Sequence, residues 1–276
     1  MTEEFDLIIE PSKGFKGYWR ELWRYRELFF FLAWRDVLVR YKQTILGLAW
    51  AIIRPFLILI VLTVVFGKLA KFPTEGRAPY PVLVLTALLP WQLFANALSG
   101  SSSSLINNAS MISKIYFPRI IIPMSSTIVS FIDFLIAFAL LVVMMFWYGY
   151  SPDWKIILLP CFVLIALLAA LGGGLWMSAL NVKYRDFRYI VPFIVQFGLY
   201  ISPVGFSSRV IPEKWRLLYA LNPMVAAIDG FRWSLLGGDV AFSFSTFLIS
   251  SAVSTALFWS GLNYFRKTER SFADMI

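Results

Sequence analysis

The chain has 276 residues, of which 59% are hydrophobic and only 15% are charged, and its formal net charge is +9. So few charged side chains cannot cover a soluble protein of this length, and the chain is therefore predicted to be a polytopic, all-α integral membrane protein. It has no histidine, a single cysteine (Cys161) and no G-x-x-x-x-G-K-[ST] motif, so we expect no Cys/His metal site, no intrachain disulfide and no nucleotide bound through a P-loop.

Residues 1–45 form a cytoplasmic N-terminal segment, and within it residues 17–42 are too charged to cross a bilayer. At about 100° per residue the apolar side chains fall in one sector, so this stretch is predicted to be an amphipathic helix in the membrane interface. The sector contains Trp19, Leu22, Trp23, Phe29, Phe30, Ala33 and Val37. Two interpretations stay open: the cations bind anionic lipid, or they also meet the anionic head group of a substrate.

The region 46–263 is predicted to contain six transmembrane helices. The expected spans are residues 46–69, 80–100, 120–148, 156–180, 189–206 and 241–263. The fifth is short and carries Pro192 and Pro203. Lys and Arg outside the spans are concentrated in the N-terminal segment, which predicts that both termini, including the tail 264–276, are cytoplasmic.

Apart from Lys68 at the end of the first span, two charged residues, Arg54 and Asp133, lie inside these spans. A charge near the bilayer centre costs about 2.5–3.5 kcal/mol, so each is expected to face a partner or a water-filled cavity. Arg54 lies closer to the cytoplasmic interface if its span begins late. For Asp133 a hydrogen bond between helices is favoured over a proton relay, because no His or Lys lies near it in sequence.

Aromatic residues make up 18% of the chain, and several lie in or beside the spans. They either line a conduit in which sugar C–H groups stack on the rings, or simply pack helices together. The candidates for a conduit are Trp91, Phe94, Trp176, Phe197 and Tyr200.

The segment 207–240, between the last two spans, is predicted to contain two short amphipathic helices on the outer side. They cover residues 213–219 and 224–236 and are separated by Asn222-Pro223. Such helices would dip into the outer leaflet as a gate or form a plain external cap. The candidate gate residues are Trp215 and the i, i+3 pair Asp229 and Arg232.

Five stretches of the chain resemble the membrane subunit of ABC-2 type polysaccharide exporters, which move O-antigen, teichoic acid or capsule precursors. They occur in the expected order over about 200 residues. The stretches are RDVLVRYKQTILGLAWAIIRPF (35–56), LLPWQLFANAL (88–98), NNASMISKIYFPRIIIP (107–123), ALNVKYRDFRYIVPF (179–193), and ALNPM followed by GFRWSLLG (220–237).

The resemblance implies a homodimer in the bacterial cytoplasmic membrane, with two copies of a separate P-loop ATPase that binds ATP and Mg. This chain would then be a permease subunit without a cofactor or an enzymatic activity of its own. A cytoplasmic coupling segment, residues 106–119, would contact the ATPase through Ser113, Lys114, Tyr116, Phe117 and Arg119, with residues 183–188 as a secondary contact.

The implied substrate is a glycan on a polyprenyl diphosphate, with O-antigen as the first candidate, and its diphosphate suits the basic residues Arg35, Arg40 and Lys42. We also expect the chain to contact membrane lipid, and we expect no nucleic acid as a partner. Two alternatives remain: an ABC-2 exporter of drugs or small lipids, and, more remotely, a membrane-embedded glycosyltransferase. The latter would need a carboxylate cluster on an aqueous loop, and the longest outer segment has no Asp-x-Asp pattern.

Overall fold

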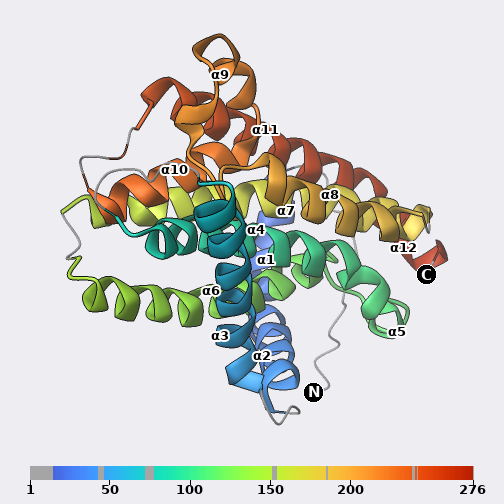
Figure 1. Cartoon of the computed structure of the whole chain (residues 1–276). Helices are drawn as coiled ribbons and strands as arrows, with labels where there is room; N and C mark the ends of the chain where they lie inside the picture. Colours follow the sequence, from blue (N-terminus) through green and yellow to red (C-terminus); the bar gives the residue numbers. More distant parts are fainter. Residues whose placement is uncertain are drawn as a thin grey trace, which may run out of the picture.

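The computed structural model describes residues 15–42, 47–71, 78–150, 154–184, 186–237, 240 and 242–275, and within these ranges the protein is all-helical (Figure 1). The N-terminal helices are α1 (Phe15–Arg24), α2 (Arg26–Lys42) and α3 (Gly47–Leu62), which continues as a π-helix (Thr63–Leu69). The central ones are α4 (Tyr80–Asn107), α5 (Ala109–Ile112), α6 (Ile121–Trp147), a 3₁₀ turn (Trp154–Leu158), α7 (Leu159–Lys183) and α8 (Phe187–Ile201). After a 3₁₀ turn (Ser208–Val210) follow α9 (Glu213–Tyr219), α10 (Pro223–Leu236), α11 (Phe244–Thr268), a last 3₁₀ turn (Glu269–Ser271) and α12 (Phe272–Met275).

Five helical segments of the described chain are long and apolar enough to cross a membrane. They are Ala49–Leu69, Tyr80–Asn107, Ile121–Trp147, Trp154–Lys183 and Phe244–Thr268. The fifth predicted span is different, because α8 has 15 residues and ends at Ile201. At about 1.5 Å per residue it is shorter than the hydrocarbon core of a bilayer. The prediction that this helix continues to residue 206 is wrong: Ser202 is extended, and the buried residues after it form a turn.

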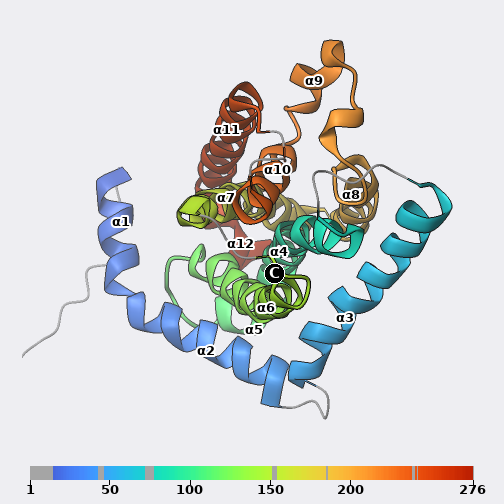
Figure 2. The same ribbon diagram turned by 60° about the vertical axis from the view of Figure 1, so that its left-hand side comes forward.

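Helix α4 lies at the centre of the bundle, with α6, α7 and α10 packed around it (Figure 2). Most of its residues from Val82 to Leu98 are buried, and they form the main core with side chains of α6, α7 and α10. Helix α11 packs on the far side of α7, where two glycines bring the backbones together. A Cβ atom on Gly172 would lie 2.5 Å from the backbone nitrogen of Phe258, and one on Gly261 would lie 2.3 Å from the carbonyl oxygen of Gly172. Small residues allow this close helix approach inside a membrane.

Helices α1, α2 and α3 form an outer layer that wraps around one side of the bundle, and α3 crosses the other spans steeply (Figures 1 and 2). The prediction of one continuous interfacial helix is wrong in one respect, because the helix is broken at Tyr25 into α1 and α2. Helix α2 buries Leu32 and Ala33 against the bundle, while Phe30 and Trp34 remain exposed. Its apolar residues thus serve two surfaces, one facing the protein and one facing outward.

A second, smaller core lies where the N-terminal helices meet the C-terminal end of the chain. It includes Tyr18 of α1, Leu32 of α2, Phe117 of the segment between α5 and α6, Phe265 of α11 and Phe272 of α12. The rings of Phe265 and Phe272 meet edge to face with centroids 5.2 Å apart. This core holds together four parts of the chain that are far apart in sequence.

Candidate functional site

A polar groove runs between α2, α3, α4 and α6. It consists of two adjoining pockets of about 350 and 670 Å³, which share Arg40, Arg54, Asn96 and Ser130. We call it the polar groove and define it by these four residues together with Arg35 and Asp133. Its position between a loosely packed outer layer and the central helix α4 gives it an opening toward the surface.

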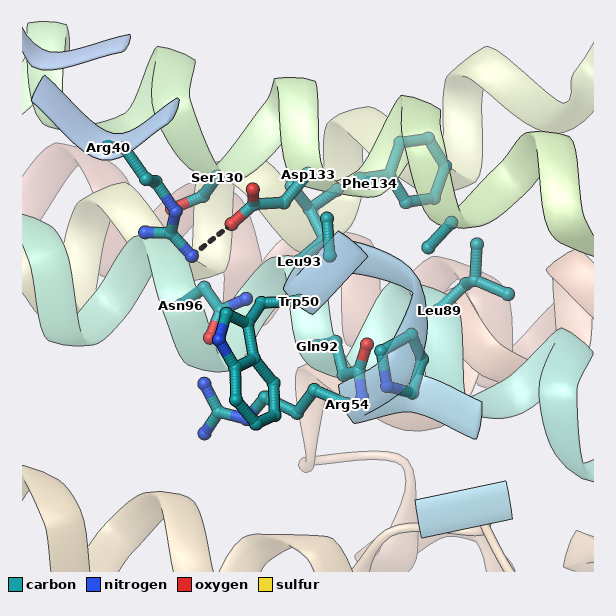
Figure 3. A pocket seen from close by; sticks show the side chains of 13 residues that line it. Arg40, Trp50, Arg54, Leu89, Gln92, Leu93, Asn96, Ser130, Asp133 and Phe134 are labelled. Atoms are coloured by element: carbon teal, nitrogen blue, oxygen red, sulfur yellow. Dashed lines mark ion pairs between the residues drawn. The ribbon is translucent and has the colours of Figure 1, made fainter. Parts of the chain in front are cut away.

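Asp133, in the middle of α6, is bound to α2 at one wall of the groove. Its carboxylate forms an ion pair with Arg40 and accepts a hydrogen bond from the hydroxyl of Tyr41 (Figure 3). The residue is only 7% exposed, so the charge is compensated where it is buried. Two neighbouring side chains of α2 thus hold the end of the interfacial layer against the bundle.

Arg54 reaches the same groove from α3, beside Trp50 (Figure 3). It is exposed within this chain and lines both pockets, so the expectation that it faces a cavity agrees with its position. On the facing side, Gln92 and Asn96 of α4 point into the groove, and no hydrogen-bond partner satisfies the buried side-chain nitrogen of Gln92 in the described residues (Figure 3). A ligand in the groove therefore meets a guanidinium group and amides together.

Arg35 marks the other end of the groove. It forms an ion pair of 2.7 Å with Asp36 and donates a hydrogen bond of 2.8 Å to the side-chain oxygen of Asn108, at the end of α4. Of the three residues predicted to receive a substrate head group, the structure brings Arg35 and Arg40 together in the groove and joins Arg54 to them. Lys42 is exposed at the end of α2 and does not line either pocket.

The wall of α4 was not predicted as part of the site. It carries Asn96, Ser99, Ser103, Ser104 and Asn107 along one face. The run of serines at 101–104, preceded by Ser99-Gly100 inside an apolar helix, is the signal that could have pointed to it. With its three arginines, two carboxylates and row of hydroxyl and amide groups, the groove is suited to an anionic, hydrogen-bonding head group. Among the described residues no group of His, Cys, Asp and Glu is arranged to hold a metal ion.

The predicted coupling segment has one exposed part and one buried part. Ser113, Lys114, Ile115 and Tyr116 are exposed. Phe117, however, is only 3% exposed and belongs to the second core, so it anchors the segment from within and offers no surface to a partner. Arg119 is half-buried and contacts Glu269, at the end of α11. Of the secondary contact 183–188, residue 185 lies outside the described residues.

The five aromatic residues predicted to line a conduit fall into separate places. Trp91 and Phe94 are buried, with ring centroids 5.4 Å apart, and Trp91 packs against Gly198 of α8. Phe197 and Tyr200 are exposed on α8. Trp176 stacks on Tyr264 of α11 with centroids 4.1 Å apart. One chain therefore does not bring them into a common lining, and their part in a conduit stays a prediction.

The two helices predicted as a gate differ from each other. Helix α9 is exposed over almost its whole length, and Trp215 is 52% exposed. The following helix was expected to be amphipathic, but α10 is buried from Met224 to Ile228 and again at Phe231 and Arg232, and its part in a gate stays a prediction. Asp229 and Tyr219 line a pocket of about 370 Å³ between α9, α10 and α11.

Arg232 is fully buried, and its surroundings explain how the bundle accepts it. Its guanidinium donates hydrogen bonds of 3.0 Å to the carbonyl oxygens of Val204 and Phe206, and one of 3.3 Å to that of Leu83. The first two carbonyls belong to the turn after α8, where no helix ladder satisfies them. Arg232 thus anchors this turn to the centre of the bundle.

Comparison with known proteins agrees with these features. The family model described as ABC-2 type transporter matches residues 27–236. The chain is 27% identical to the O-antigen export system permease protein RfbA of Myxococcus xanthus, over 93% of this chain and 98% of the relative. It is 28% identical to the protein of the same name in Klebsiella pneumoniae, over 88% of this chain and 92% of the relative. It is 20% identical to the polysialic acid transport protein KpsM of Escherichia coli, over 86% and 92% respectively.

Proposed function

The chain belongs to the ABC-2 type transporter family, and we propose from this premise that it is the permease subunit of an ATP-driven exporter of polyprenyl-diphosphate-linked polysaccharide, with O-antigen as the first candidate. The observation that carries the proposal is the similarity to permeases named for O-antigen export along nearly the whole of both chains. The family membership and the apolar helices place the protein in a membrane as a multi-pass transport subunit. The bacterial inner membrane with cytoplasmic termini is the finer part of the proposal, and the charge bias of the sequence supports it.

The energy source in this proposal is a separate P-loop ATPase, present in two copies, which binds ATP and Mg. The chain has no P-loop motif of its own, so a partner must hydrolyse the nucleotide. The exposed residues 113–116 form a short apolar and basic protrusion that is suited to a groove on such a partner. Because Ile115 and Tyr116 are more than half exposed, the contact would bury apolar surface as well as the charge of Lys114.

A second copy of this chain completes the pathway in the proposal. Helix α8 exposes a row of large side chains, Tyr189, Phe193, Phe197 and Tyr200, and α3 exposes Phe56, Leu57 and Val61. These side chains are exposed in a single chain, and α3 lies at the outside of the bundle (Figure 2). A conduit wide enough for a glycan would form between two copies, which brings the exposed aromatics of α8 toward its lining.

The polar groove receives the diphosphate of the lipid carrier in this proposal. Arg40 and Arg54 approach it from different helices, and Arg35 lies at its end. Guanidinium groups bind phosphate oxygens through paired, charge-assisted hydrogen bonds. The aliphatic carrier would leave the groove beside α3, whose outer face is apolar and exposed.

The test uses this chain co-expressed with the P-loop ATPase proposed as its partner, purified and reconstituted in liposomes. We expect the two chains to co-purify and the ATPase rate to rise on addition of a polyprenyl-diphosphate-linked glycan and not of a small amphiphilic drug. Stimulation by the drug alone would support the small-lipid or drug exporter instead. Nucleotide hydrolysis by this chain without its partner would overturn the proposal.

The role of the groove is tested in the same liposomes with Arg40→Gln and Arg54→Gln. Each removes a charge-assisted hydrogen bond, so the glycolipid concentration for half-maximal stimulation should rise by at least about tenfold. Lys42→Gln is the matched control, because Lys42 is a cation on the same helix as Arg40 that does not line the groove. An equal effect of all three substitutions would show that general surface charge, and not the groove, attracts the substrate.

A further inference from the structure

Glu269 lies at the C-terminal end of α11 and contacts the segment that leads into α6. Its carboxylate accepts a hydrogen bond of 2.5 Å from the backbone N–H of Arg119 and one of 3.2 Å from the hydroxyl of Tyr18. In return, the guanidinium of Arg119 donates to the backbone carbonyl of Glu269. The two residues therefore hold each other through both side chain and backbone, and Tyr18 adds α1 to the contact.

The carboxylate of Glu269 lies near the N-terminus of α6, and the guanidinium of Arg119 lies near the C-terminus of α11. Helix α6 begins at Ile121, two residues after Arg119, and α11 ends at Thr268, directly before Glu269. A carboxylate is favourable at a helix N-terminus and a cation at a C-terminus, because unpaired backbone N–H and C=O groups are exposed there. The side chain of each residue thus lies at the helix end that suits its charge, which gives the contact a defined direction.

Apolar packing encloses the pair and makes it a stiff joint. Phe117 and Ile120 on one side, and Phe265 and Phe272 on the other, are buried in the second core. Arg266 lies over the ring of Tyr18 at 4.6 Å from its centroid. Burial raises the pKa of the Glu269 carboxyl, and the hydrogen bonds from Arg119 and Tyr18 act against that rise.

The segment 113–119 is thus exposed at one end and clamped at the other. Residues 113–116 project outward, while Phe117 and Arg119 are fixed to α11 and α1. A displacement of the protruding end cannot be absorbed by the loop alone, because its other end is attached to the last span and to the interfacial layer. Helix α1 in turn precedes α2, which carries Arg40 on the wall of the polar groove and Tyr41, the hydrogen-bond donor to Asp133.

We propose that Glu269 is a positioning residue of the transport cycle, a joint that makes the coupling segment, the end of α11 and the interfacial helix α1 move together when the ATPase partner acts on residues 113–116. This inference rests on the proposed function. It assigns to the turn after the last span a role in passing movement from the ATPase contact to the membrane helices. It predicts that loss of the carboxylate charge uncouples ATP hydrolysis from export.

The first test compares Glu269→Gln with wild type in the reconstituted complex with its ATPase, measuring glycolipid exported per ATP hydrolysed. Glutamine keeps a side-chain oxygen that accepts from the Arg119 N–H, so assembly should persist and ATP hydrolysis should stay within about twofold, while export per ATP falls by about tenfold. Glu27→Gln is the control, because Glu27 is an exposed carboxylate of α2 outside the joint. Tyr18→Phe removes only the 3.2 Å hydrogen bond and should lower the ratio by about twofold to threefold.

The second test places spin labels at the exposed positions 24 of α1 and 267 of α11, two of the elements that the joint connects, both outside the proposed ATPase contact. In wild type the distance between them should stay the same when nucleotide is bound, and in Glu269→Gln its distribution should broaden. An unchanged export ratio in Glu269→Gln, or failure of that variant and Tyr18→Phe to assemble with the ATPase at all, would overturn the joint. If the wild-type chain itself neither binds an ATPase nor exports glycolipid, the proposed function fails, whatever the variants do.

Discussion

Helices α3 and α4 both run through long apolar stretches, yet they pack very differently. In the most apolar part of Tyr80–Asn107, 83% of the residues are buried inside the chain, against 17% for Ala49–Leu69. Helix α3 is nevertheless the more uniformly apolar of the two, while α4 carries a row of serines and amides. In a membrane, apolar surface gains little from leaving lipid, so helices associate through close packing and polar contacts. The less apolar helix is therefore the central one.

The same contrast separates a rigid part of the molecule from a part that can open. The centre, α4 with α7, α10 and α11, is held by glycine contacts and by the buried Arg232. The outer layer, α2 and α3, is held to the bundle beside the groove by Arg40 and Tyr41 on Asp133. In the proposed function, substrate entry at the groove would involve the outer layer and leave the centre in place, so substitutions in the two regions should have different consequences.

The largest effect on stability is expected for Arg232→Met, in the centre. It leaves the carbonyls of Val204 and Phe206 without this donor, while that of Leu83 keeps the hydrogen bond from the Thr86 hydroxyl, so the free energy of unfolding should fall by about 3 kcal/mol. Thermal unfolding of the detergent-purified protein measures this change. Arg209→Met, at an exposed position of the 3₁₀ turn before α9, is the control and should shift the midpoint far less. A tolerated Arg232→Met would mean that the centre is not rigid at this turn.

A smaller loss is expected for Gly172→Ala. The added methyl would lie 2.5 Å from the backbone nitrogen of Phe258, and because a backbone cannot move aside like a side chain, α7 and α11 must separate. Overpacking of this kind costs about 1–3 kcal/mol. Gly173→Ala is the matched control, since its methyl would meet a side-chain carbon of Leu98 at 3.1 Å, which can shift. Equal midpoints for the two variants would remove the basis for treating the α7–α11 contact as a rigid crossing.

The smallest change in stability is expected for Asp133→Asn, in the outer layer. The Arg40 side chain is 47% exposed, so its ion pair is partly screened and the loss should be about 1 kcal/mol or less. The outer layer should loosen, however, so in a Cys161→Ser background the cysteine of Ala33→Cys, at a buried position of α2, should react faster with a thiol reagent. Asp36→Asn is the control, because Asp36 pairs only with its neighbour Arg35 in the described contacts. An unchanged rate of labelling would show that contacts other than those of Asp133 keep α2 against the bundle.

Local sequence patterns predicted the helices well and their surroundings less well. The start of α4 and both ends of α9 follow from Pro79, Pro212 and the Asn222-Pro223 break, which limit the backbone locally. The end of α8 at Ile201 was missed because apolar residues continue beyond it into a buried turn. The burial of α10 was also missed, because its arginine, Arg232, is expected at the surface. Only the fold brings three backbone carbonyls to it.

The candidate site shows the same limit. Arg54 and Asp133 are conspicuous in the sequence as charges inside apolar spans, so each was expected to face a partner or a cavity. Asp133 lies against Arg40, and Arg54 lines the groove. Glu269 and Tyr18 gave no such signal, because a charged residue after a span and a tyrosine in an interfacial helix are ordinary on their own. Their 3.2 Å contact joins residues 251 positions apart, and only folding brings them together.

The amino-acid sequence by itself determined that this is a helical membrane protein of the ABC-2 exporter type, because composition and local motifs are properties of short stretches of chain. The tertiary structure alone decided which apolar helix became the centre, which arginine was buried, and which charges met in the groove and at the end of α11. Each of these depends on contacts between segments distant in sequence. In a bilayer, where apolar faces look alike to lipid and to protein, close packing and polar pairing choose among the arrangements that the sequence allows.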